Sequence, residues 1–418
     1  MRIRDWDQNL KVRLFGEALM NISYWMFFPF LTIYFADSFG KDRAGLLLIF
    51  SQVFSVAANL LGGHFADRFG RKRMMVLSSI GQGLSFIAFA FGSSPWLVSP
   101  WLGFIAFTVA GVFGAFYWPA SQAMVADVVD EKNRSDVFAI FYTSINIAVV
   151  IGPLLGAIFY VNYRFLLLLA AGLVCILLGF ILIKWTRETA PLSSYEHNRY
   201  ALKWHSFLHN QIKDYSLILK DRIFLLFILA GVMAGQTFMQ LDLLIPVYIK
   251  DVMQEGQDLL PAWGWNFNVK GEQAFGIVLA ENGLLVALLT VFVTKWMAQY
   301  HERNVFMLSS LLYAVSVVLF SQTNWIWGFI FAMAVYTFGE LVSAGLQQSF
   351  VSKIAPEHMR GQYFAAASLR FTISRTIAPL FIPMTAWVGN SWTFFILAVL
   401  ALFSAVLYWL MFKLLKNK

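Results

Sequence analysis

Residues 62 to 73 read Gly62-Gly63-His64-Phe65-Ala66-Asp67-Arg68-Phe69-Gly70-Arg71-Lys72-Arg73 and lie between two long apolar runs. Gly70 can adopt the positive φ that a tight turn needs, and Gly62 and Gly63 allow helix backbones to approach closely. The basic side chains suit the anionic surface of an inner membrane leaflet. We therefore expect residues 62 to 73 to form a cytoplasmic hairpin between two membrane-spanning helices.

The composition also indicates an integral membrane protein. Of the 418 residues, 59% are hydrophobic and only 13% are charged, which is too apolar for a soluble globular protein. The single cysteine, Cys175, lies inside an apolar run, so a disulfide framework is excluded and a redox role is not expected.

The net charge of +8 is distributed unevenly between the two sides of the membrane. Most of the 31 Lys and Arg fall in loops on the side of residues 62–73, which predicts that both termini are cytoplasmic. The acidic residues near the N-terminus argue against a removable signal peptide. The few basic residues expected on the opposite side are Lys41, Arg43, Arg164, Lys250 and Lys270.

Apolar segments long enough to cross about 30 Å of hydrocarbon recur roughly twelve times. We predict an all-α membrane protein with two six-helix bundles, at residues 1–184 and 223–418, joined by a cytoplasmic linker at 185–222. The expected spans are 13–36, 44–66, 74–92, 101–127, 136–161, 164–184, 223–250, 272–297, 304–320, 326–350, 362–389 and 391–413.

The linker contains Trp204, Leu208, Ile212, Tyr215 and Leu219 at helical spacing. This pattern is compatible with a helix on the inner membrane surface and equally with a linker helix packed on protein.

The two halves are repeats of each other. Without a gap, Gln122 aligns with Gln348 and Pro153 with Pro379. Closer to the start of each half, Asp37 aligns with Asp251, and the change of offset places an insertion in the external loop at 254–272. A parallel repeat of this kind is typical of transporters that hold substrate near the midplane between halves.

The pattern Gly63-x-x-x-Asp67-Arg68-x-Gly70-Arg71-Lys72 resembles the loop signature of the major facilitator superfamily. The resemblance implies twelve helices and a latch in which Asp67 and Arg71 engage an acid on helix 4, here Asp127. The second half has lost the signature, because Thr294, Ala298, His301 and Glu302 stand at the corresponding positions. For Arg68, Lys72 and Arg73 we favour simple anchoring of the topology.

A second pattern lies in the fifth expected span, at Ala148-x-x-x-Gly152-Pro153-x-x-Gly156-Ala157. It resembles the antiporter signature of drug-exporting members of this superfamily. The alternative is a generic packing face of small residues. The arginine that many drug exporters carry in helix 4 is absent from 101–127, so coupling is expected elsewhere.

Charged residues inside spans are costly and are therefore candidate functional residues. Glu340 is the leading candidate because about fourteen residues of helix place it near the midplane. It lies on a polar stripe with Tyr336, Ser343 and Gln347, and a carboxyl group in an apolar environment holds a proton more readily than one in water. The run Tyr336 to Glu340 is similar to helix 10 of bacterial multidrug transporters of the LmrP type, where the acid serves cation recognition and coupling.

Further acids and polar residues could join this site. Asp242 and Glu281 could take part in coupling or form structural pairs, and Glu17 could form a local helix pair with Arg13. Arg370 could pair with Glu340, or together with Arg375 bind an anionic substrate. The residues expected to line a mixed cavity are Glu17, Asn21, Tyr24, Tyr142, Asn146, Tyr336 and Gln236.

The sequence thus predicts a proton-coupled secondary transporter of the bacterial cytoplasmic membrane that exports lipophilic, cationic compounds by alternating access. The alternative is proton-coupled transport of an anionic metabolite or lipid-like substrate through Arg370 and Arg375. We expect a monomer in contact with membrane lipids, without cofactor, metal or nucleic acid. An enzyme is not expected, because phosphate-loop, metal-cluster and catalytic-triad patterns are missing from the sequence.

Overall fold

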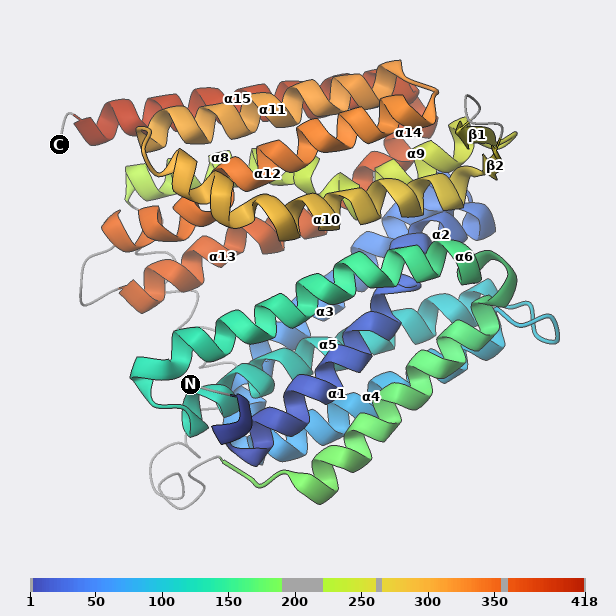
Figure 1. The fold of residues 1–418 in the computed structure, drawn as a ribbon, viewed down its shortest axis with the longest axis vertical. Helices are drawn as coiled ribbons and strands as arrows, with labels where there is room; N and C mark the ends of the chain where they lie inside the picture. The colour runs from blue at the N-terminus through green and yellow to red at the C-terminus, as the bar shows by residue number, and fades with distance from the viewer. Residues whose placement is uncertain (1–2, 190–220, 261–264, 355–359, 417–418) are drawn as a thin grey trace. The chain divides into compact units, whose positions relative to one another are not determined.

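A computed structural model describes residues 3–189, 221–260, 265–354 and 360–416, and within these ranges the side chains of Asp67 and Tyr142 are among those left undescribed. The described chain is almost entirely helical (Figure 1). The linker helix predicted between Trp204 and Leu219 lies outside the described residues.

The first part of the chain contains long helices broken at two places. Pro29 lies in a 3-10 turn within the first expected span, where its missing N–H interrupts the helix. The fifth and sixth spans form one continuous element with non-helical angles at Tyr163 (φ −126°, ψ 26°). The elements are η1 Ile3–Asp5, α1 Gln8–Trp25, η2 Phe28–Phe30, α2 Leu31–Phe39, α3 Lys41–Phe69, α4 Arg71–Gly92, α5 Pro100–Val128 and α6 Glu131–Trp185.

The second part repeats this plan, with interruptions in the seventh and eleventh spans. Its elements are α8 Arg222–Phe238, η4 Met239–Asp242, α9 Leu244–Val252, β1 Gln257–Leu260, β2 Trp265–Val269, α10 Gly271–Met297, α11 Glu302–Gln322, α12 Ile326–Ile354, α13 Arg360–Ile377, η7 Ala378–Leu380, α14 Phe381–Val388 and α15 Asn390–Lys416.

Eleven helices of the described chain are long and apolar enough to cross a membrane. The expected span at 362–389 is not among them. It is divided into α13, η7 and α14, with Pro379 in the turn and two arginines in α13. Because of this division, the eleventh predicted span does not form one continuous apolar helix.

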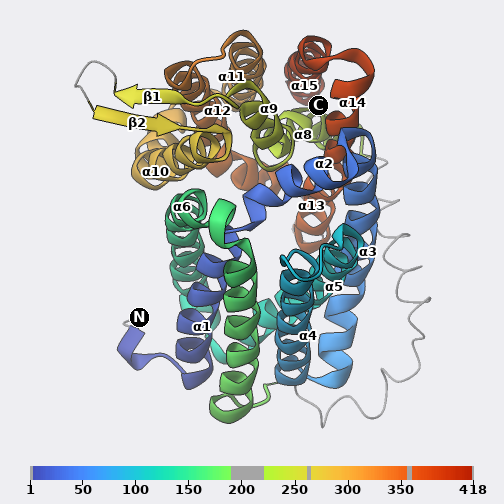
Figure 2. The ribbon, with the colours of Figure 1, turned by 90° about the vertical axis from the view of Figure 1, so that its right-hand side faces the viewer.

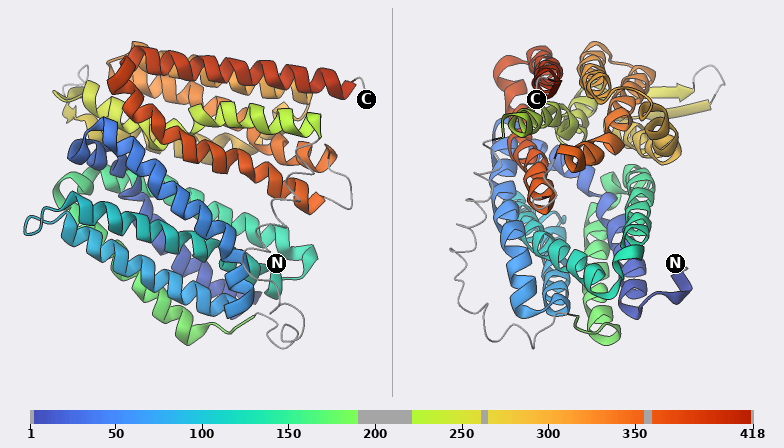
Figure 3. Two further views of the ribbon diagram at one scale, coloured as in Figure 1. Left: turned by 180° about the vertical axis from the view of Figure 1, so that it is seen from behind. Right: turned by 90° about the vertical axis from the view of Figure 1, so that its left-hand side faces the viewer.

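The chain forms two compact units, Met1–Leu31 with Phe50–Leu208, and Thr32–Ile49 with His209–Lys418. In the first unit, called unit 1 below, α4 packs against both α5 and α6 (Figure 2). In the second, unit 2, α15 packs along α8 and α11 (Figure 3). A cluster of aromatic side chains that includes Phe227, Phe306 and Phe350 fills the core of unit 2.

Residues 32–49 belong to unit 2, although the sequence places them in the first repeat. Thr32 Oγ1 donates a hydrogen bond to the carbonyl of Asp242 over 3.3 Å. Two ion pairs, Lys41 with Asp251 and Lys250 with Asp37, connect α2 and α3 to α9. The predicted bundle boundaries at residues 184 and 223 stay a prediction.

The insertion predicted at 254–272 contains a two-stranded antiparallel hairpin, which was not expected from the sequence (Figure 2). Gln257 pairs with Val269, and Asp258 with Asn268. The hairpin is fixed to the loop before α12, because Gln257 Nε2 donates to the carbonyl of Asn324 over 2.6 Å.

Candidate functional site

Glu340 is a half-buried acid of unit 2 whose carboxylate accepts a hydrogen bond from a neutral amide. Asn282 on α10 donates its side-chain amide to Glu340 Oε2 over 3.2 Å and to Thr337 Oγ1 over 3.0 Å. Thr337 lies one turn before Glu340 on α12 and donates to the carbonyl of Met333 over 2.8 Å. The Glu340 carboxylate therefore has a polar partner but no described basic partner that would cancel its charge.

The polar stripe predicted on α12 packs onto neighbouring helices of the same unit. Tyr336 donates its hydroxyl to the carbonyl of Phe238, the last residue of α8, over 2.6 Å. Ser343 accepts a hydrogen bond from Ser309 on α11 over 3.0 Å. Tyr336 and Ser343 are both buried, so these two side chains fix α12 to α8 and α11.

Two further acids have buried oxygens without a described donor. Asp242 lies in the 3-10 turn after α8, close enough to Glu340 and Arg375 for electrostatic interaction. Neither Asp242 Oδ1 nor Glu281 Oε2 accepts a hydrogen bond within the described ranges. Asp242 and Glu340 therefore interact electrostatically within unit 2, and their part in coupling stays a prediction.

The predicted pair between Glu340 and Arg370 is wrong, since no hydrogen bond or ion pair joins these two described side chains. Arg370 donates to Gln347 Oε1 over 3.2 Å and to the carbonyl of Ala367 over 3.0 Å. Its guanidinium lies over the ring of Phe227 at 4.3 Å. The physical reason is position along α12. Gln347, which Arg370 contacts, lies about 10 Å further along the helix than Glu340.

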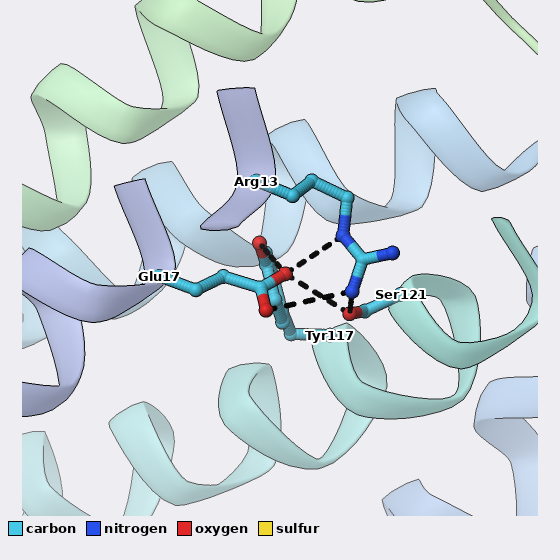
Figure 4. A network of polar contacts seen from close by, with 4 residues as sticks. All are labelled: Arg13, Glu17, Tyr117 and Ser121. Atoms are coloured by element: carbon cyan, nitrogen blue, oxygen red, sulfur yellow. Dashed lines mark hydrogen bonds and ion pairs between the residues drawn. The ribbon is translucent and has the colours of Figure 1, made fainter. Parts of the chain in front are cut away.

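Unit 1 contains a buried polar network between α1 and α5 (Figure 4). Arg13 Nε donates to Glu17 Oε1 over 2.8 Å, and both side chains are almost fully buried. Tyr117 and Ser121 each donate to the same carboxylate oxygen over 3.0 Å, and Arg13 also donates to Ser121. The local pair predicted for Arg13 and Glu17 is present, and it neutralises the charge of Glu17.

A cavity of about 240 Å³ lies beside this network and is lined by Arg13, Glu17, Trp118, Gln122 and Phe141, among others. Of the residues expected in a mixed cavity, Glu17 lines it. Tyr24 stacks on Phe28 with ring centroids 4.7 Å apart. Asn21 is buried and Asn146 is half-buried, while the Tyr142 side chain is outside the described part.

Two residues of the predicted latch, Arg71 and Asp127, form an ion pair. Arg71 Nε lies 2.8 Å from Asp127 Oδ2. Gly70 has φ +97° and ψ 147°, a backbone conformation essentially restricted to glycine. Gly63 lies in the last turns of α3, and the side chain of Asp67 is not described.

Glu188, which the sequence analysis did not single out, contacts the start of α4 beside the Arg71–Asp127 ion pair. Glu188, just after α6, accepts hydrogen bonds from the backbone N–H groups of Arg71 and Lys72 over 2.8 and 3.3 Å. It thus caps the N-terminus of α4 from another part of the chain, as a carboxylate at a helix N-terminus should. A Cβ at position 70 would overlap the Glu188 carboxylate.

The glycines of the predicted antiporter pattern face the first span. A Cβ at Gly152 would overlap Trp25, and one at Gly156 would overlap the carbonyl of Met26. Pro153 is buried inside α6. These residues therefore allow α6 to pack closely on the first span. Their predicted role in antiport stays a prediction.

Eleven helices of the described chain could cross a membrane, and the family match gives the class of membrane protein. The chain matches the family model of the Major Facilitator Superfamily at residues 14–265 and 259–417. The protein belongs to the Major Facilitator Superfamily, as the loop signature indicated.

Curated relatives narrow the class. The chain is 58% identical over 416 residues, 99% of its length and 98% of the relative's, to a "Na(+), Li(+), K(+)/H(+) antiporter" of Planococcus maritimus. It is 20% identical over 91% of its length to the "Multidrug resistance protein MdtH" of Escherichia coli (strain SE11), of which the match covers 85%. These findings support a proton-coupled transporter.

Solved structures agree on the fold. A "POT family transporter in complex with 5-aminolevulinic acid" has a TM-score of 0.75 and 16% sequence identity, with 95% of this chain and 94% of that chain covered. A "peptide transporter POT in complex with sulfate" has a TM-score of 0.73 and also 16% identity, with 100% of this chain and 96% of that chain covered. At this identity the likeness concerns the fold alone.

Proposed function

We propose that this protein exchanges small monovalent cations, Na⁺, Li⁺ or K⁺, for protons across the bacterial cytoplasmic membrane. The observation that carries the proposal is the environment of Glu340, whose carboxylate meets the neutral amide of Asn282. The 58% identical relative bears the name of a Na⁺, Li⁺, K⁺/H⁺ antiporter, which supports this choice of cations.

An uncompensated carboxylate in a low-dielectric interior must bind a cation or a proton. If a cation bound among the buried acids and a proton on Glu340 exclude each other, binding of either releases the other, and exchange follows once each form can change its exposure. The pairing of Arg370 with Gln347 supports this scheme, because a guanidinium beside Glu340 would have neutralised its charge permanently.

In this scheme the two halves alternate in access. Arg71, Asp127 and Asp67 act as the latch at the inner side. The proposed cycle gives a supporting part to Glu281, a half-buried acid on α10.

Export of lipophilic cations is the second candidate. The distant MdtH relatives and the cavity of unit 1, lined by Trp118 and Phe141, favour it. The pairing of Glu17 with Arg13 argues against it, because the cavity then offers no net negative charge. Transport of an anionic metabolite has less support, since Arg370 is engaged by Gln347 and Phe227.

The test uses inverted membrane vesicles in which respiration or ATP hydrolysis has acidified the interior. Addition of Na⁺, Li⁺ or K⁺ should release protons and restore acridine orange fluorescence with the wild-type protein, and Glu340→Gln should abolish the response. Glu302→Gln is the matched control, because Glu302, the first residue of α11, forms an ion pair with Lys353 in the last turn of α12. Proton release by ethidium but by none of the three metal ions would favour the second candidate.

A further inference from the structure

The seventh span is interrupted where its polar residues are concentrated. α8 ends at Phe238, η4 covers Met239–Asp242, and α9 begins at Leu244. Between residues 236 and 242, three side-chain oxygens are buried and accept no hydrogen bond from the part of the chain that is described. They are Gln236 Oε1, Gln240 Oε1 and Asp242 Oδ1.

The orientation of both glutamine amides is fixed by their nitrogens. Gln236 Nε2 donates to the carbonyl of Val232 over 3.3 Å. Gln240 Nε2 donates to the carbonyls of Gln236 and Ala378 over 2.8 and 3.4 Å. A flipped amide would place oxygen against a carbonyl oxygen, so the acceptor oxygens are the atoms left over.

Each buried acceptor that lacks a hydrogen-bond donor costs about 1–3 kcal/mol of folding free energy. Gln236 is 3% exposed and Gln240 is fully buried. All three orphan atoms are acceptors, so the group that satisfies them must be a cation or a hydrogen-bond donor. Hard cations prefer carboxylate and carbonyl oxygens.

The surrounding structure holds this break open. The eleventh span has its own 3-10 turn, η7, which packs against η4 and supplies the carbonyl of Ala378 to Gln240. Tyr336 donates to the carbonyl of Phe238, and Thr32 donates to the carbonyl of Asp242. Interrupted helices that expose oxygens near the midplane are a general way in which transporters bind Na⁺.

We propose that Gln236, Gln240 and Asp242 supply oxygen ligands to the transported monovalent cation at the break of the seventh span. The site rests on the proposed function, and it assigns separate tasks to two neighbouring acids. Asp242 binds the cation together with the two amides, and Glu340 exchanges the proton. The electrostatic interaction between the two acids couples these events, because a cation at Asp242 disfavours a proton at Glu340.

The test measures the Na⁺ concentration that gives half-maximal exchange in inverted vesicles, together with Na⁺ binding to the purified protein by calorimetry. Gln236→Leu and Asp242→Asn should each raise the half-maximal Na⁺ concentration at least tenfold and weaken Na⁺ binding in parallel. Gln236→Leu removes only an intrahelical donor besides the orphan oxygen, so it is the variant expected to fold normally. Gln240→Leu tests the third ligand.

The matched control is Gln82→Leu. Gln82 Oε1, on α4 in unit 1, is also buried without a described donor, so the control separates a general effect of losing such an oxygen from loss of the site. We expect its half-maximal Na⁺ concentration to stay at the wild-type value.

Wild-type exchange with an unchanged half-maximal Na⁺ concentration in Gln236→Leu and Asp242→Asn would overturn this site and leave the proposed function standing. That result would mean that water satisfies the three oxygens. Absence of exchange and of Na⁺ binding in the wild-type protein would overturn both proposals. An equal change in Gln82→Leu would also overturn the site.

Discussion

Asn282 donates its side-chain amide to the carboxylate of Glu340 over 3.2 Å, and it is the hydrogen-bond donor that the described residues provide to this acid. A neutral donor stabilises a carboxylate without cancelling its charge. Glu340 therefore keeps a charge that a proton can neutralise, and the proposed exchange depends on competition between that proton and the transported cation.

A fixed positive charge beside Glu340 should therefore stop exchange. We expect Asn282→Lys to lower the cation-induced proton flux at least tenfold, because the ammonium would neutralise Glu340 and disfavour its protonation. Asn282→Gln, which keeps a neutral amide, should retain more activity. The comparison of the two variants by acridine orange fluorescence checks this, and equal activity would contradict it.

The Arg13–Glu17 pair is expected to act in stability and not in coupling. Glu17→Gln leaves the buried guanidinium of Arg13 without a counter-ion, which costs about 3–5 kcal/mol. The double variant Arg13→Met with Glu17→Leu should recover most of this loss, since replacement of a whole buried pair by apolar side chains is often neutral.

Thermal unfolding in detergent measures the stability, and vesicle exchange measures coupling. The double variant should still exchange Na⁺ for protons. Complete loss of exchange in a stably folded double variant would show that Glu17 takes part in coupling.

The latch predicts a charge-swap result. Asp127→Arg and Arg71→Asp should each lower the exchange rate severalfold, because the ion pair at 2.8 Å is lost and like charges meet. The swapped protein that carries both changes should recover part of the rate. Failure of the swap to improve on either single variant would indicate that the two side chains act separately.

Gly70 and Glu188 should depend on each other. Gly70→Ala is expected to cost about 1–3 kcal/mol for backbone strain at φ +97°, and its methyl group would displace the Glu188 carboxylate. Glu188→Ala removes the same cap of α4, so the double variant should be only slightly less stable than Gly70→Ala. Full additivity in thermal unfolding would contradict this link.

Much of the fold could be predicted from the sequence, because a membrane-spanning helix is recognised by its length and its apolar content. The interruptions at η4 and η7 were not predicted, since they depend on contacts such as that between Gln240 and Ala378, which are far apart in the chain. The hairpin at residues 257–269 was missed for a similar reason, because Gln257 is fixed by the distant Asn324.

The candidate site shows the same limits. Glu340 and Asp242 could be singled out because an ionisable residue in an apolar span is conspicuous. The partner of Arg370 could not be predicted, because the position of a residue along its helix does not show that its guanidinium reaches Gln347. Glu188 lies more than a hundred residues from the helix that it caps, and short-range spacing carries no signal for such a contact.

The most direct test of the account is proton-coupled ²²Na⁺ movement in proteoliposomes that contain only the purified protein. With an acidic interior and a neutral exterior, the wild-type protein should accumulate ²²Na⁺ while protons leave, and unlabelled Li⁺ or K⁺ should compete. Glu340→Gln should show no gradient-driven accumulation under the same conditions. Accumulation at the wild-type rate by Glu340→Gln, or no ²²Na⁺ movement by the wild-type protein, would contradict the proposed exchange.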